Sequence, residues 1–456
     1  MSITLELVRN VLKTPFEAFD SGTLERARNR LIDVVGCALA GARAPGCSAL
    51  IELLAEEGGR QESTVFVHGH RLPARSAALA NSVMARSYDF EPTGPLVNGK
   101  STPAHVSGTT VPAALAVGEH VAASGRAVLT ALILGDDLAS RIIAASNLNI
   151  DSGWDSTGTA NAFGATAIAA RLYGLDESQA LNALGLVLNR LAGTFQNIHD
   201  GAHSFKLPQG LAAEAGIFSA ALARKGFTGV RDALLSKNGY FSLYCRSYQL
   251  DALTHGLGGN FCADNTHKPY PCCRSNHSAI DCVLDLLQTH PIDPEEVEQI
   301  VVDVTPTAKD FAVGRTFRLR DVPQIDAAFS LQYTVASTLF RKSVRLEHFT
   351  EEYVRDPAVL ALAEKIRLRD SIPPEKPLGA RVRIELKHGA ELEKCIDMPR
   401  GNGTATPLSA EEKRKKFLEN ARFSEALTAT QAEELLYRLE RFEELECVSV
   451  VGQLLS

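Results

Sequence analysis

This chain of 456 residues has no run of about twenty uninterrupted apolar residues, so the sequence predicts no transmembrane helix. Its first residues, Met-Ser-Ile-Thr-Leu-Glu-Leu, lack the cationic segment of a secretory signal and the arginine-rich composition of a transit peptide. A basic excess is also missing, because 47 Lys and Arg residues face 54 Asp and Glu residues. Nucleic acid normally requires a basic protein surface. We therefore expect neither a membrane nor a nucleic acid as the partner.

The short motifs of several large enzyme classes are absent as well. There is no G-x-G-x-x-G after a predicted strand, no G-x-x-x-x-G-K-[ST], no H-E-x-x-H and no G-x-S-x-G. These absences disfavour nucleotide-driven chemistry and the common hydrolases.

The nine cysteines are an odd number spread over a long chain, unlike a secreted disulfide framework, which predicts reduced thiols and a cytoplasmic location. No C-x-x-C pair occurs, and the adjacent Cys272 and Cys273 would chelate one tetrahedral ion poorly. His199 and His203 have helical i, i+4 spacing, but Gly201 between them favours a loop as much as a helix. The sequence therefore predicts no metal site.

What the chain does contain is apolar sequence: 45% of its residues are hydrophobic and 22% are charged, enough for about two or three folding units. Amphipathic or nearly apolar segments of helical length occupy most of the first half. These predicted helices are 22–43 (with Ser21 as N-cap), 111–123, 127–145, 160–173, 179–193 and 209–225. We interpret residues 1–266 as a large all-helical domain.

Residues 267–401 differ in pattern and predict a smaller α+β domain. Helices are expected at 276–289 and 325–340, and a strand begins at Glu298. Alternating apolar and charged residues from 380 and from 391, with a turn at His388-Gly389, indicate a hairpin. The tail is helical again, with starts near Ser409 and 428, so residues 402–456 are assigned to the large domain. The predicted fold is mainly α, with the α+β unit inserted as a lid before the C-terminal helices.

Several polar residues lie in predicted loops beside apolar helices. Asp89, Thr93 and His105 bring a carboxylate, a hydroxyl and an imidazole into one loop, a set suited to general acid–base catalysis. Equally, Asp89 could cap a helix and His105 be a hydrogen-bonded loop residue. Lys206 precedes an apolar helix and in most proteins would be a solvated charge.

A second polar run lies at the predicted domain boundary, in Lys268-Pro-Tyr-Pro-Cys-Cys-Arg274-Ser-Asn-His277. Its cationic side chains suit carboxylate binding, with Arg bidentate and Lys as a point charge. The alternative is a basic loop that ends at a helix start. Tyr333 is either a tyrosine at the core edge or a phenolic donor. Asp137 and Arg141, at i, i+4 spacing, are interpreted as an ion pair rather than as catalysts.

Taken in order, these segments resemble the MmgE/PrpD family, which includes 2-methylcitrate dehydratase, cis-aconitate decarboxylase and iminodisuccinate epimerase. The segments that carry the resemblance are Asp89-Phe-x-x-Thr93, His105-x-Ser-Gly, Arg171-Leu-Tyr-Gly-Leu, Lys206 before a Gly/Ala-rich helix, Lys268-x-x-Pro with His277, and Phe329-Ser-Leu-Gln-Tyr333. The similarity extends from the Leu-Ile-Asp-Val-Val-Gly-Cys-Ala segment near the N-terminus to the C-terminal hairpin and beyond.

The resemblance implies an active site between the two domains, no metal or organic cofactor, a homodimer, and a small di- or tricarboxylate as substrate. It implies Asp89, His105 and Tyr333 as catalytic residues. It implies Thr93, Lys206 and Lys268 as substrate-binding residues, to which the boundary run adds Arg274 and His277. Asp155 is a further catalytic candidate because it stands where related members carry an imidazole; it either replaces that imidazole in function or only fills its space. A carboxylate there changes which group can give or take a proton near pH 7.

Family resemblance leaves the reaction open. Dehydration or hydration and decarboxylation, both lyase reactions, are the leading expectations. Epimerisation of a dicarboxylate and a non-catalytic carboxylate-binding scaffold are the alternatives.

Overall fold

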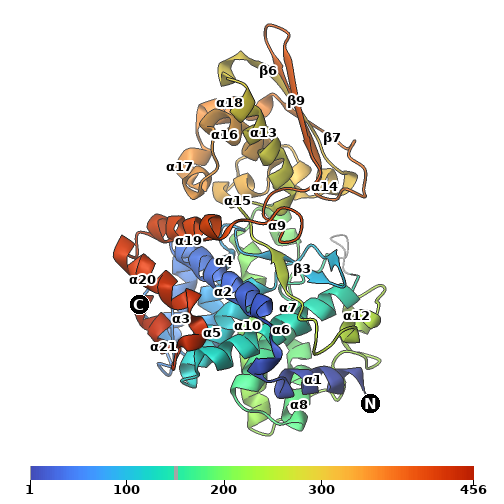
Figure 1. Ribbon diagram of the computed structural model, residues 1–456, viewed down its shortest axis with the longest axis vertical. Helices are drawn as coiled ribbons and strands as arrows, with labels where there is room; N and C mark the ends of the chain where they lie inside the picture. Colours follow the sequence, from blue (N-terminus) through green and yellow to red (C-terminus); the bar gives the residue numbers. More distant parts are fainter. Residues whose placement is uncertain (1, 148–152) are drawn as a thin grey trace.

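The computed structural model describes residues 2–147 and 153–456. Figure 1 shows a large lower part made mostly of helices and a smaller upper part that contains an extended sheet. We call them the helical part (α1–α12, α19–α21 and β1–β5) and the mixed part (α13–α18 and β6–β9). The fold is thus mainly α with a smaller sheet-containing part, as the sequence predicts.

The helical part packs the two ends of the chain together: α2 contacts both α4 and α19, and α10 contacts α4, α5 and α7. Its helices are α1 (Ile3–Lys13), α2 (Ser21–Gly41), α3 (Cys47–Glu57), α4 (Ala74–Arg86), α5 (Ser107–His120), α6 (Gly125–Ala145), α7 (Ala160–Leu172), α8 (Glu177–Val187), α9 (Gln196–Asp200), α10 (Leu207–Arg224), α11 (Tyr240–Tyr244), α12 (Asp251–Thr254), α19 (Ala410–Ser424), α20 (Ala429–Glu440) and α21 (Ser449–Leu454).

Several predicted helix ends are wrong, for local reasons. The N-cap of α2 is Asp20, whose side chain accepts from the Thr23 amide, and Ser21 is the first helical residue. α5 begins at Ser107 rather than 111 and continues through Pro112. α8 ends at Val187 and is followed by a 3-10 turn rather than continuing to 193.

The large part is not purely helical, contrary to the prediction. It contains the short pair β1 (Ser63–Thr64) and β2 (Arg71–Leu72), and a three-stranded sheet of order β4-β3-β5. The latter strands are β3 (Thr93–Val97), β4 (Lys100–Ser101) and β5 (Asp264–Thr266). β3 pairs antiparallel with β5, with Thr93 opposite Thr266 and Pro95 opposite Asp264. Strands this short, rich in Gly, Pro and Thr, carry little periodic signal.

The mixed part is built on a sheet of order β7-β6-β8-β9, in which β6 is parallel to β7 and antiparallel to β8. The predicted hairpin is confirmed, with Gly389 at φ 85° in its turn. The strands are β6 (Val297–Asp303), β7 (Ile366–Arg369), β8 (Ala380–Leu386) and β9 (Glu391–Ile396). The helices are α13 (His277–Thr289), α14 (Pro306–Asp310), α15 (Pro323–Ala328), α16 (Leu331–Arg341), α17 (Glu351–Val354) and α18 (Pro357–Glu364).

Two further sequence predictions concern this framework. The single helix expected at 325–340 is two helices, because Ser330 leaves helical geometry and caps α16 by accepting from the Tyr333 amide. The Asp137–Arg141 ion pair is confirmed: its atoms are 2.8 Å apart and both side chains are buried. Within residues 2–147 and 153–456, no helix has the length and apolar character to cross a bilayer.

Candidate active site

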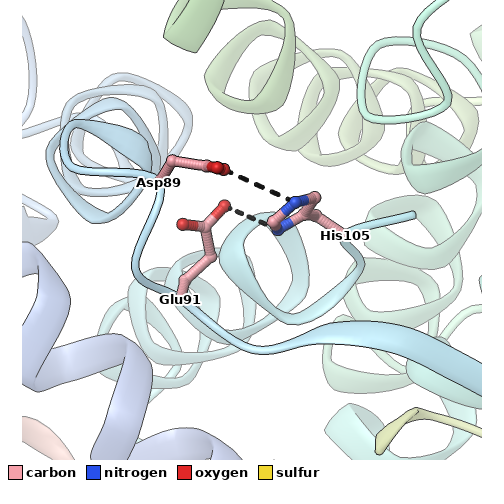
Figure 2. Close-up of side chains that lie close together, drawn as sticks. All are labelled: Asp89, Glu91 and His105. Carbon is pink, nitrogen blue, oxygen red and sulfur yellow. Dashed lines mark ion pairs between the residues drawn. The ribbon is translucent and has the colours of Figure 1, made fainter. Parts of the chain in front are cut away.

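Two buried carboxylates follow the end of α4. The helix ends at Arg86, and the chain then turns through Asp89, which has φ 48° and whose amide donates to the Arg86 carbonyl (3.0 Å). Asp is one of the residue types that tolerates this left-handed conformation, and such strain often marks a functional segment. The turn directs Asp89 and Glu91 toward the same imidazole, that of His105, as Figure 2 shows.

His105 lies just before α5, and its position is fixed by Asp264 of β5. One carboxylate oxygen of Asp264 accepts from the Val106 amide (3.0 Å), the Ser107 amide (2.7 Å) and the Ser107 hydroxyl (2.7 Å). A carboxylate at a helix N-terminus stabilises the unpaired amides there. On the other side, Asn161 of α7 donates to the His105 carbonyl (2.6 Å). The backbone at His105 is therefore held from two directions.

Lys268 reaches the same cluster because of the β3–β5 register. Thr93 pairs with Thr266, so continuing that antiparallel register by two residues places Lys268 opposite Glu91. Its ammonium group donates to the Asp89 carbonyl (2.6 Å) and lies 3.0 Å from Asp89 Oδ2. Lys268 is fully buried, and Asp89 is the carboxylate that balances its charge.

Arg86 occupies the centre of this cluster. Its Nη1 donates to Asp89 Oδ1, lies 2.8 Å from Glu91 Oε1 and is 3.2 Å from His105 Nε2. Sequence reasoning missed both Arg86 and Glu91. Both lie within three residues of Asp89, but no motif marks them, and their importance comes from burial next to one another.

Neutral His105 is the form that this environment favours. Burial lowers the pKa of His105, the charges of Arg86 and Lys268 lower it further, and Glu91 opposes them. Because a guanidinium can only donate, Nε2 is the acceptor, and the proton of the neutral ring lies on Nδ1. Nδ1 is 3.0 Å from Glu91 Oε1 in a contact that lacks hydrogen-bond geometry, and Asp89 is farther, 3.5 Å from Nε2. Glu91 rather than Asp89 is therefore the carboxylate nearest to the His105 ring.

Glu91 itself stays ionised. Burial alone would raise its pKa, but the positive charges of Arg86 and Lys268 hold the pKa of Glu91 well below its usual value. The cluster thus contains two carboxylates balanced by two cations, with a neutral imidazole between them. His105 keeps 15% of its side chain exposed, whereas Glu91 is completely covered. A substrate would meet the cluster at His105.

Asp89, Glu91 and His105 are also close enough together, within 4.8 Å, to hold a metal ion. The position such an ion would take is filled by Arg86 Nη1, which contacts both carboxylates and the imidazole. The guanidinium supplies the positive charge that a metal would otherwise bring. These residues fit a permanent ion network better than a metal centre.

Chelation should therefore leave the protein's activity unchanged. We expect dialysis against EDTA, followed by assay with and without added Zn²⁺, Mn²⁺ or Mg²⁺, to give rates that agree within about twofold. The reason is that none of the proposed catalytic groups needs a bound metal ion. An activity lost on dialysis and restored by one of these ions would contradict this interpretation.

Lys206 lies apart from the cluster, at the C-terminal end of α4. Its ammonium group donates to the Pro45 carbonyl (2.6 Å) and the Ser87 hydroxyl (3.1 Å), and lies 3.5 Å from Cys47 Sγ. No ion pair among the described residues includes it, and burial lowers its pKa. Lys206 is thus a buried cation without a carboxylate partner, whose ammonium group is held by three neutral neighbours.

Two other predicted residues border the cluster. The Thr93 hydroxyl donates to the Ala104 carbonyl (2.6 Å) and so ties β3 to the segment that leads to His105. Asp155 is buried, accepts from the Thr157 amide (2.9 Å) and contributes to raising the pKa of Arg86. Both side chains are engaged in local structure, and their proposed roles with substrate remain predictions.

Arg274 and His277 lie at the passage between the two parts of the fold. Arg274 donates to the carbonyls of Pro399 (2.9 Å) and Arg400 (2.6 Å) and lies 3.0 Å from His277 Nδ1. Burial lowers the pKa of Arg274 to about 10, and burial together with Arg274 lowers that of His277 well below its usual value. Arg274 thus ties the segment before α13 to the segment around residues 399–400, and it does not contact Asp89, Glu91 or His105.

Tyr333 is placed elsewhere. It is fully buried in α16 of the mixed part, its hydroxyl donates to the His348 carbonyl, and its ring packs 5.4 Å from Phe317. Burial raises its pKa to about 12. This position fits the interpretation of Tyr333 as a core tyrosine, and its catalytic role stays a prediction. His199 and His203 also fall on separate short helices divided by Gly201, so they do not share a helix face.

Comparison with known proteins agrees with this architecture. Sequence models of the MmgE/PrpD N-terminal and C-terminal domains match residues 6–253 and 270–438. A cis-aconitate decarboxylase-like protein, oryM, of Aspergillus oryzae is 23% identical over 442 residues, which cover 91% of this chain and 90% of that protein. A cis-aconitate decarboxylase of Aspergillus terreus is 23% identical over 426 residues, or 88% and 85% of the two chains. With family models matching both of its halves, the chain belongs to the MmgE/PrpD family.

Proposed function

We propose that this protein is a lyase that acts on a small di- or tricarboxylic acid, either by dehydration and hydration or by decarboxylation. The observation that carries the proposal is the neutral, partly exposed His105 between two buried carboxylates and two buried cations. Support also comes from the relatives named as cis-aconitate decarboxylases, although 23% identity does not transfer a substrate.

Reactions of this kind form or discharge a carbanion next to a carboxylate. In a dehydration, Nε2 of His105 accepts the proton from the carbon next to the carboxylate, in place of its contact with Arg86. The electron pair forms the double bond, and the leaving hydroxide takes the proton from the imidazolium and departs as water. In a decarboxylation, the bond to carbon dioxide breaks instead, and the carbanion takes its proton from the imidazolium form of His105. Glu91, 3.0 Å from Nδ1, stabilises that imidazolium in both reactions.

The negative charge on the substrate is met by fixed positive charge in a site with little water. Arg86 lies beside Nε2, while Lys206 is a buried cation without a carboxylate partner, and a substrate carboxylate would have to replace one of its contacts to Pro45, Ser87 or Cys47.

A panel of acids tests the proposal. Purified protein is incubated with cis-aconitate, 2-methylcitrate and simpler dicarboxylates, and carbon dioxide release and near-ultraviolet absorbance of unsaturated acids are followed. The true substrate should also stabilise the fold, by about 2.7 kcal/mol at 100 times its dissociation constant. Solvent deuterium incorporation without either product would instead indicate an epimerase, and stabilisation without any reaction a binding scaffold; either outcome overturns the lyase assignment.

A further inference from the structure

A second polar cavity lies where the mixed part meets α9. It has a volume of about 570 Å³, within the range of small-molecule sites. Ile198 and His199 of α9 form one wall. The other wall comes from the mixed part: residues 312 and 314–318, together with Arg320, Asp326, Phe329 and Ser330. We call this cavity the arginine pocket.

The charge of the arginine pocket is unbalanced. Arg315, Arg318 and Arg320 line it, and Asp326 is the carboxylate among its lining residues. Asp326 is already paired with Arg320, whose Nε lies 2.7 Å from Asp326 Oδ1 and whose amide donates to Oδ2 (2.6 Å). Two guanidinium groups, those of the solvent-exposed residues Arg315 and Arg318, therefore remain without a carboxylate partner in the pocket.

Most hydrogen-bond donors of Arg315 and Arg318 have no acceptor within the described part of the chain. Arg315 makes one long contact, 3.4 Å from Nη1 to the His199 carbonyl. For Arg318, the described part of the chain records no hydrogen bond or ion pair. The His199 Nδ1 atom is also buried without a hydrogen-bond partner in residues 2–147 and 153–456. Unpaired donors around one cavity favour an oxyanion ligand, which a guanidinium binds bidentately.

The pocket adjoins the catalytic cluster through two aromatic rings. Phe329 in its wall packs against Phe205, with ring centroids 5.6 Å apart. The Phe205 ring lies 5.6 Å from the guanidinium carbon of Arg86. A chain of two ring contacts thus links the wall of the arginine pocket to the guanidinium of Arg86.

We propose that the arginine pocket binds a carboxylate anion with two or more negative charges, held by Arg315 and Arg318. The charge and the free donors define an oxyanion site. That the ligand is a polycarboxylate rather than inorganic phosphate rests on the proposed function. The pocket then concentrates the acid beside the catalytic cluster and contributes to substrate affinity.

The test uses propane-1,2,3-tricarboxylate, which has no hydroxyl group to eliminate, in isothermal titration at low ionic strength. The Arg315→Gln/Arg318→Gln double variant should raise its dissociation constant about tenfold or more, because two charge-assisted contacts are lost. Arg318→Gln alone removes no internal contact and should raise it about threefold. The control, Arg60→Gln/Arg231→Gln, makes the same charge change at exposed sites outside the pocket and should bind within about twofold of wild type.

Unchanged binding in the double variant, or equal loss in the control, would overturn the assignment. Inorganic phosphate bound as tightly as the tricarboxylate would overturn the choice of ligand. The proposed function is judged separately. His105→Ala should keep tricarboxylate binding. If the Arg315 and Arg318 substitutions weaken binding but no acid is turned over, the assignment of the pocket holds and the lyase assignment fails. With a turned-over acid, the double variant should raise KM about tenfold and leave kcat within about twofold.

Discussion

His105→Ala lowers kcat on the true substrate by about 10²–10⁴, the usual contribution of a positioned proton-transfer group. The imidazole supplies the base at Nε2; Arg86 cannot replace it because a guanidinium does not accept a proton, and Glu91 cannot because its cations hold it ionised at low pKa. The fold should survive, since His105 is the most exposed side chain of the cluster. Steady-state kinetics with circular dichroism and a melting curve check both statements.

The control is His70→Ala, which removes an exposed imidazole that makes no side-chain hydrogen bond or ion pair within residues 2–147 and 153–456 and should leave kcat unchanged. A correctly folded His105→Ala variant with near wild-type kcat would show that the proton moves elsewhere, and the site assignment would be wrong.

The pH dependence isolates the part played by Glu91. Because His105 acts when neutral, kcat/KM should rise as the pH rises through the His105 pKa, which burial and the charge of Arg86 place below its ordinary value. Glu91 raises that pKa, so Glu91→Gln should lower it further and move the acidic limb of the profile to lower pH. Glu375→Gln, an exposed carboxylate in a turn, should leave the profile in place. A limb that stays or moves upward in Glu91→Gln would contradict the pairing of Glu91 with His105.

Local sequence spacing predicted local features well. The Asp137–Arg141 pair and the 380–396 hairpin each depend on contacts a few residues apart, and both are confirmed. The break between α15 and α16 was missed because apolar periodicity continues across Phe329-Ser330, although Ser330 is a recognisable N-cap. With the break, Tyr333 becomes a first-turn residue of α16 buried in the mixed part.

The assembly of the site was beyond sequence reasoning for a different reason. Lys268 meets Asp89 only because of the register between β3 and β5, two strands separated by more than 150 residues and too short to show alternation. Folding also buries the charges of Arg86 and Glu91, so each of these residues requires an oppositely charged partner. The family resemblance identified Asp89, His105 and Lys268. The ion pairs that join them depend on tertiary structure and cannot be seen in the sequence.

Lys268→Met lowers the free energy of unfolding by about 3–5 kcal/mol, the cost of leaving a buried charge without its partner. Lys268 is fully buried, and its loss leaves Asp89 and Glu91 with Arg86 as the remaining cation of the cluster. Met keeps the apolar stem, so the change reports on charge rather than on a cavity. Lys376→Met, at a half-exposed pair with Asp397, should change stability little because water already solvates both charges. Urea unfolding of the variants measures the difference.

A double-mutant cycle shows whether charge balance is the cause. Asp89→Asn alone leaves two cations against Glu91, whereas Lys268→Met/Asp89→Asn leaves one cation and one carboxylate. The double variant should therefore be more stable than the sum of the two single effects predicts, with a coupling energy of about 1–3 kcal/mol. Strictly additive effects would mean that Lys268 stabilises the fold through its Asp89 carbonyl bond alone. In that case the balance between two carboxylates and two cations would not be what stabilises the cluster. The explanation that this balance keeps His105 neutral would then be wrong as well.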